Sequence, residues 1–139
     1  MKLPLLLMGS ALFAATIASA QVITTIEFTM NSAFEVGNTT LPSGRYDIRP
    51  TDDQDILAIQ GQKGTPSVLF DVTELDSVSP FKQTDLIFNK YGNILVLKSI
   101  KVAGETIGVT TVMSELERNH FKTHGKPVKV TFTAKKKQP

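Results

Sequence analysis

The stretch VITTIEFTM, residues 22–30, decides the fold, because hydrophobic and polar side chains alternate along it. In an extended chain Ile26 and Phe28 point to one side, and Glu27 and Thr29 point to the other. A period of two residues is typical of a β-strand that buries one face and exposes the other to water. The stretch therefore predicts one strand of an antiparallel sheet.

The same alternation recurs along most of the chain, and turn residues separate its repeats. The four residues 41–44, LPSG, place proline second and glycine fourth, as in a type I turn. Gly37-Asn38 suits a tight hairpin, because glycine tolerates the positive φ that such a turn requires. The expected strands are 22–30, 33–37, 44–50, 55–60, 66–74, 81–90, 93–102, 105–113 and 127–134.

One segment, residues 114–123, departs from the alternation. It begins with Ser114, and Glu117 follows three residues later, which is the spacing of a helical capping box. Gly125 and Pro127 end any helix. About eight or nine short strands with one helix predict an all-β fold, either a small antiparallel sandwich or a closed barrel.

The N-terminus predicts export. Residues 1–20, MKLPLLLMGSALFAATIASA, combine Lys2, a short apolar run and an exit of small residues that ends in Ala20. This pattern is typical of a signal peptide cleaved between Ala20 and Gln21, and an uncleaved anchor is the less favoured alternative. We expect a periplasmic or extracellular protein with one β domain over 21–134, a basic tail over 135–139 and no membrane span after cleavage.

Charge is distributed unevenly, and cysteine is absent. The chain has 15 basic and 13 acidic residues, and all the acidic ones precede Arg118. From Arg118 to Pro139 every charged residue is a lysine or an arginine. The lack of cysteine excludes disulfides and thiolate metal or redox sites.

Three sequence blocks resemble a known group. Residues 34–37 read FEVG and residues 41–48 read LPSGRYDI, and LIFNKYG follows at 86–92. In this order the blocks are similar to the F-x-V-G…L-P-A-G-x-Y-x-I signature of small exported β proteins of acidobacteria, with Ser43 in place of the usual alanine. The resemblance implies export and a β fold, and it assigns no activity.

The chain shows no nucleophile–base pattern, so we expect no enzyme and no cofactor. It has no G-x-S-x-G motif and only two histidines. Glu117, His120 and His124 share one helix face and form a candidate metal site. Nearby lysines and the helix end at Gly125 favour a solvated helix instead.

A second candidate metal site is the acidic group Asp52, Asp53 and Asp55, which lies between two expected strands. Calcium takes several oxygen ligands, and a loop rich in carboxylates can supply them. The group lacks the spacing of an EF-hand, so a polar turn is the favoured interpretation.

The basic C-terminus is the most distinctive feature of the sequence. Lys129, Lys135, Lys136 and Lys137 are candidate contacts to an anionic surface. The expected partner is an anionic envelope polymer or the acidic body of another copy, and a disordered solubilising tail is the alternative. Nucleic acid is not expected, because no aromatic stacking platform accompanies the lysines.

Three functional hypotheses follow from these patterns. The leading one is a non-catalytic exported β module with a binding or structural role in the cell envelope. The second is a small barrel that carries an apolar ligand. The third, a hydrolase that uses His120 or the 52–55 acidic group, has the least support.

Overall fold

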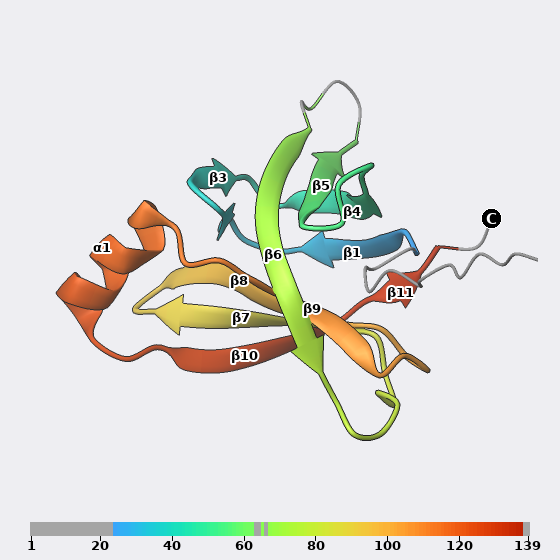
Figure 1. Cartoon of the computed structure of the whole chain (residues 1–139). Helices are drawn as coiled ribbons and strands as arrows, with labels where there is room; N and C mark the ends of the chain where they lie inside the picture. The colour runs from blue at the N-terminus through green and yellow to red at the C-terminus, as the bar shows by residue number, and fades with distance from the viewer. Residues whose placement is uncertain (1–23, 63–64, 66, 138–139) are drawn as a thin grey trace, which may run out of the picture.

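The protein is a mostly β structure with one short helix, seen here in a computed structural model that describes residues 24–62, 65 and 67–137 (Figure 1). The expected signal peptide and its cleavage site lie outside the described residues. The strands are β1 (Ile26–Met30), β2 (Phe34–Val36), β3 (Thr39–Leu41), β4 (Gly44–Pro50), β5 (Ile56–Gly61), β6 (Val68–Asp76), β7 (Asp85–Tyr91), β8 (Ile94–Lys101), β9 (Ile107–Thr111), β10 (Val128–Thr133) and β11 (Lys135–Lys136). The helix, α1 (Glu115–His124), lies between β9 and β10.

The strands form one continuous sheet that bends along β6. Its order is β10-β7-β8-β9-β6-β5-β4-β1-β11, and β2 joins β3 and β8 beside this path. The first half of β6 pairs with β5, and the second half pairs with β9. Figure 1 shows β6 crossing from the upper half of the sheet to the lower half. One continuous sheet therefore forms both layers of the fold.

Aromatic side chains fill the space between the two halves. The Phe34 ring centroid lies 5.0 Å from that of Tyr46 and 6.0 Å from those of Phe28 and Phe88. Phe28 and Tyr46 belong to one half of the sheet, and Phe88 belongs to the other. Edge-to-face contacts at these distances stabilise the packing beyond the area they bury. The core therefore joins both halves through Phe34.

The all-β prediction is confirmed, but the closed-barrel alternative is wrong. The two ends of the sheet, β10 and β11, are consecutive in the chain and are separated only by Ala134. The backbone N–H of Ala134 donates to the Thr84 carbonyl, 2.9 Å away, which continues the pairing of β10 with β7 by one residue, and the chain then pairs with β1 as β11. The ladder stays open at this corner.

The structure also differs in strand number and direction. The described residues form eleven strands in place of the expected eight or nine, because β3 and β11 show no alternation of hydrophobic and polar residues. The pairing is antiparallel except between β2 and β8, where Glu35 lies beside Val96 in a parallel pair. The described part of the chain contains no helix long and apolar enough to cross a membrane.

Candidate functional site

Helix α1 begins where the sequence predicts, and its first turn is held at both sides. The Ser114 hydroxyl accepts the Glu117 backbone N–H at 3.0 Å, and so it satisfies one of the free donors of the helix start. The Asn38 side-chain oxygen accepts the Leu116 N–H at 3.1 Å, and this bond ties the helix to the β2–β3 turn. Gly125 closes the other end with φ of 80°.

Glu117 turns away from the cap and into the sheet, where its side chain is 1 % exposed. The Tyr91 hydroxyl donates to Glu117 Oε2 at 2.7 Å, and the Asn89 side-chain amide donates to the same oxygen at 3.0 Å. Lys98 Nζ lies 3.9 Å from Glu117 Oε1. A buried carboxylate is stable only with such partners. The helix thus docks on β7 and β8 through a polar network.

This network changes the acidity of the tyrosine. Burial raises the pKa of the Tyr91 phenol far above its usual value, and the hydrogen bond to the Glu117 carboxylate adds to the rise. An ionised phenol beside this carboxylate would place two negative charges in contact. Tyr91 therefore acts as a hydrogen-bond donor at neutral pH.

His120 makes a second polar contact between helix and sheet. Its Nε2 lies 2.9 Å and 3.0 Å from the two carboxylate oxygens of Glu35 on β2, and Glu35 is 7 % exposed. His124 lies one turn later, with its ring centroid 6.4 Å from that of His120. Together with Glu117, these contacts anchor one face of α1.

The structure does not bring the candidate metal ligands together. Glu117 faces Tyr91, and His120 faces Glu35, while His124 is exposed at the helix end. Within residues 24–62, 65 and 67–137, no three His, Cys, Asp or Glu side chains are grouped to hold a metal ion. Sequence reasoning placed Glu117 and His120 on one helix face and missed their partners, which lie on distant strands.

The acidic group at 52–55 forms a turn between β4 and β5. Asp53 Oδ1 accepts the Asp55 N–H at 2.9 Å, and the Asp53 carbonyl accepts the Ile56 N–H at 3.1 Å. The Thr51 hydroxyl donates to the Ile56 carbonyl at 2.7 Å. Asp52 is exposed beside these bonds. Such bonds are those of an ordinary polar turn.

The lysines expected to act together lie at two places. Lys129 is on β10 in one half of the sheet, whereas Lys135 and Lys136 form β11 at the edge of the other half. Lys137 Nζ lies 3.1 Å from Asp47 Oδ2, so its charge is already paired. The expected tail is thus in part a strand.

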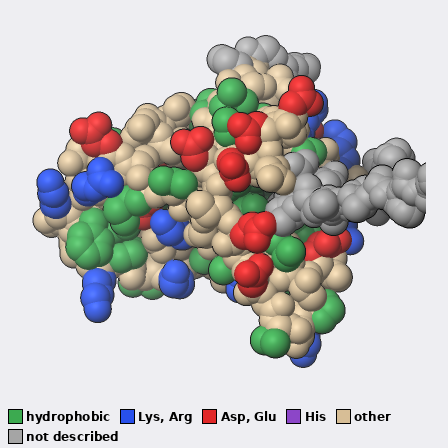
Figure 2. Space-filling view, viewed as in Figure 1, with side chains coloured by type: hydrophobic (Ala, Val, Ile, Leu, Met, Phe, Trp, Pro, Cys, Tyr) green, Lys and Arg blue, Asp and Glu red, His purple; other side chains and the backbone are tan. Residues whose placement is uncertain are grey.

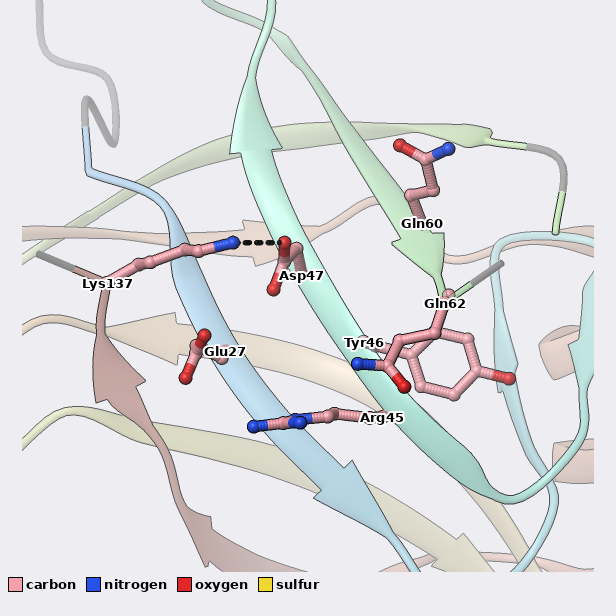
Figure 3. Close-up of a pocket in the computed structure, with 8 residues that line it drawn as sticks. Glu27, Arg45, Tyr46, Asp47, Gln60, Gln62 and Lys137 are labelled. Atoms are coloured by element: carbon pink, nitrogen blue, oxygen red, sulfur yellow. Dashed lines mark hydrogen bonds and ion pairs between the residues drawn. The ribbon is translucent and has the colours of Figure 1, made fainter. Parts of the chain in front are cut away.

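Lys137 borders a polar pocket of about 270 Å³ on the outer face of β1, β4 and β5 (Figure 3). In Figure 3 the Glu27 carboxylate lies between Lys137 and Arg45. The pocket mixes both signs of charge, and this mixture favours no single class of ion. Its lining residues are Glu27, Arg45, Tyr46, Asp47, Gln60, Gly61, Gln62 and Lys137.

A group of cations at the other end of the molecule has a simpler composition. Arg118 and Lys122 on α1, Lys126 in the following turn and Lys129 on β10 are all exposed. None of the four forms an ion pair with a described acidic residue. We call these four residues the basic end. Figure 2 shows Lys and Arg side chains gathered over α1, with an acidic side chain next to them, and further Asp and Glu side chains over the middle of the molecule.

Comparisons with known proteins add no family to this description. No family model matches the chain, and neither curated proteins nor solved structures give a significant match. The likeness to the exported β proteins of acidobacteria therefore stays a prediction, and function has to be argued from the geometry alone.

Proposed function

We propose that the protein is a non-catalytic, exported β module that binds an anionic surface of the cell envelope through its basic end. The observation that carries this proposal is the set of four exposed, unpaired cations on α1, β10 and the turn between them. Cations that are free of intramolecular partners can be neutralised by a polyanion without first breaking an ion pair. Export rests on the signal-peptide pattern of the sequence.

The burial of nearby carboxylates supports a local excess of positive charge. Glu35 and Glu117 are the acidic side chains beneath α1, and both are buried against His120, Tyr91 and Asn89. Exposed carboxylates on this face would repel an anionic partner. Here Glu35 and Glu117 are turned inward, and Glu115 at the start of α1 is the acidic residue of the helix that stays exposed, so the cations outnumber it at the surface.

Two other hypotheses have weaker support. A hydrolase would use His120 or the acidic group at 52–55, yet His120 Nε2 contacts Glu35 in the docking of the helix, and Asp53 is bonded within a turn. A carrier would need an empty apolar cavity for its ligand. The space between the sheet halves is instead filled by the rings of Phe28, Phe34 and Phe88. We therefore favour surface binding.

Charge-matched variants test the proposal. Replacing Arg118, Lys122, Lys126 and Lys129 with glutamine should strongly reduce retention of the protein on immobilised heparin. Wild-type retention should fall steeply as salt is raised, because exposed charges are screened. The measurement is the salt concentration at which each protein elutes.

The control removes the same number of charges elsewhere, at Lys82, Lys135, Lys136 and Lys137. This variant should elute close to the wild type. Equal losses in both variants would show that net charge alone controls retention, and an unchanged elution of the first variant would refute a role for the basic end.

A further inference from the structure

Helix α1 has an unusual distribution of side chains. A surface helix ordinarily packs its apolar stripe on the core and leaves polar residues in water. Here the buried residue of the helix is Glu117, and His120 also faces the sheet. Phe121 is left 42 % exposed. The helix thus uses polar side chains for docking and leaves its phenylalanine at the surface.

A second apolar side chain is exposed at the start of β10. Val128 is 66 % exposed, and only Gly125, Lys126 and Pro127 separate it from the end of α1. In Figure 2 hydrophobic side chains lie between Lys and Arg side chains over α1. The exposed apolar side chains therefore belong to the same end of the molecule as the cations.

A cation lies next to each of these apolar side chains. Arg118 precedes Phe121 by three residues, and residues three apart are neighbours on a helix surface. Lys122 lies four residues after Arg118, on the same side. Across the β7–β10 ladder, Val128 is paired with the exposed Lys90, whose side chain lies on the same face of the sheet, whereas Lys129 points to the opposite face.

We infer that this end of the molecule docks on an anionic lipid bilayer, with Phe121 and Val128 entering the headgroup region and the cations contacting lipid phosphates. The inference rests on the proposed function and names its partner. Interfacial proteins combine apolar side chains with Lys and Arg in this way. Each cation near an anionic leaflet strengthens binding by about fivefold. A soluble polyanion would use the cations and leave Phe121 and Val128 in water.

A single introduced tryptophan reports insertion directly, because the chain contains none. Phe121→Trp should show a blue-shifted emission with phosphatidylglycerol–phosphatidylcholine vesicles and no shift with pure phosphatidylcholine. Leu69→Trp is the control, since Leu69 is 62 % exposed on β6 and lines a hollow with Ser114 and Glu115 that includes no residue of the basic end. Its emission should not change. Equal emission of Phe121→Trp with and without anionic vesicles would overturn the inference.

Serine substitutions separate lipid from polymer. Phe121→Ser and Val128→Ser should each weaken cosedimentation with the anionic vesicles by about three- to tenfold and leave heparin retention unchanged. Val112→Ser is matched to Val128→Ser, because Val112 is 50 % exposed at the opposite end of α1, beside Glu115. It should bind as the wild type does.

The two measurements distinguish the possible failures. Heparin retention without vesicle binding would refute the lipid inference and leave the proposed function standing, with a polymer as the partner. A wild-type protein that binds neither heparin nor anionic vesicles would refute both proposals. Vesicle binding that Phe121→Ser and Val128→Ser leave intact would show purely electrostatic adsorption and refute insertion.

Discussion

At the scale of single residues, Glu117 shows how a polar side chain can take the place of a hydrophobic anchor. It lies in the first turn of α1, where a carboxylate also interacts favourably with the helix dipole. Its sequence context predicts a capping box, and half of that prediction is correct, because Ser114 accepts the Glu117 N–H. The side chain turns to Tyr91 and Asn89, which no local pattern places nearby.

Glu117→Gln should lower the free energy of unfolding by about 1–3 kcal/mol. The glutamine side-chain oxygen can still accept from Tyr91 and Asn89, but its NH₂ group then takes the place of Oε1, so two donors, this NH₂ and the Lys98 ammonium, face each other. Urea denaturation measures the change. Glu115→Gln is the control, because Glu115 is exposed in the same turn and has the same relation to the helix dipole. Equal effects of the two variants would contradict a role for the buried network.

At the scale of elements, local alternation predicts most strands and misses those without it. In β4, Tyr46 and Ile48 are buried and Arg45 and Arg49 are exposed, as the pattern predicts. In contrast, β11 contains only two lysines, and these residues give no hydrophobic signal. Its pairing with β1 depends on where the chain turns after β10, and that is a property of the tertiary structure.

Truncation after Ala134 should destabilise the protein by about 1–2 kcal/mol. The change removes the β1–β11 ladder, the bond from the Lys137 N–H to the Thr25 carbonyl and the ion pair with Asp47. Thermal unfolding measures it. Joint replacement of the three lysines with glutamine keeps the backbone bonds and should cost clearly less. A truncated protein as stable as the wild type would show that β11 contributes nothing.

At the scale of the whole molecule, sequence reasoning predicts an all-β core and cannot decide how the sheet ends. The candidate sites show the same limit. The polar turn at 52–55 is local and follows the pattern, whereas the Glu35–His120 contact joins residues far apart in the chain. The end of the sheet likewise rests on a change of partner, from β7 for β10 to β1 for β11. Contacts of this kind leave no periodic trace in the sequence.

Alkaline titration should report on both halves of the sheet. The two tyrosines of the chain, Tyr46 on β4 and Tyr91 on β7, are buried, and burial raises the pKa of each. In the unfolded chain both ionise near pH 10. The unfolded state then binds fewer protons than the folded state, so stability present below about pH 10 is lost as the pH rises further.

Phenolate absorbance in the near ultraviolet provides the measurement. In native protein the absorbance should not rise near pH 10 and should appear together with unfolding, whereas in denaturant it should rise near pH 10. The absence of tryptophan leaves the signal to these two side chains. A native titration step at the ordinary value would contradict the burial of at least one phenol.

The open corner at Ala134 has a consequence for the order of folding. The first strand, β1, receives its outer neighbour from the last, β11, and β7 receives its own from β10. During synthesis both margins of the sheet therefore lack their outer strands until β10 and β11 have been made. A chain that ends before β10 would expose the unpaired backbone edges of β1 and β7 together. We expect such a product to be bound by chaperones or degraded by proteases.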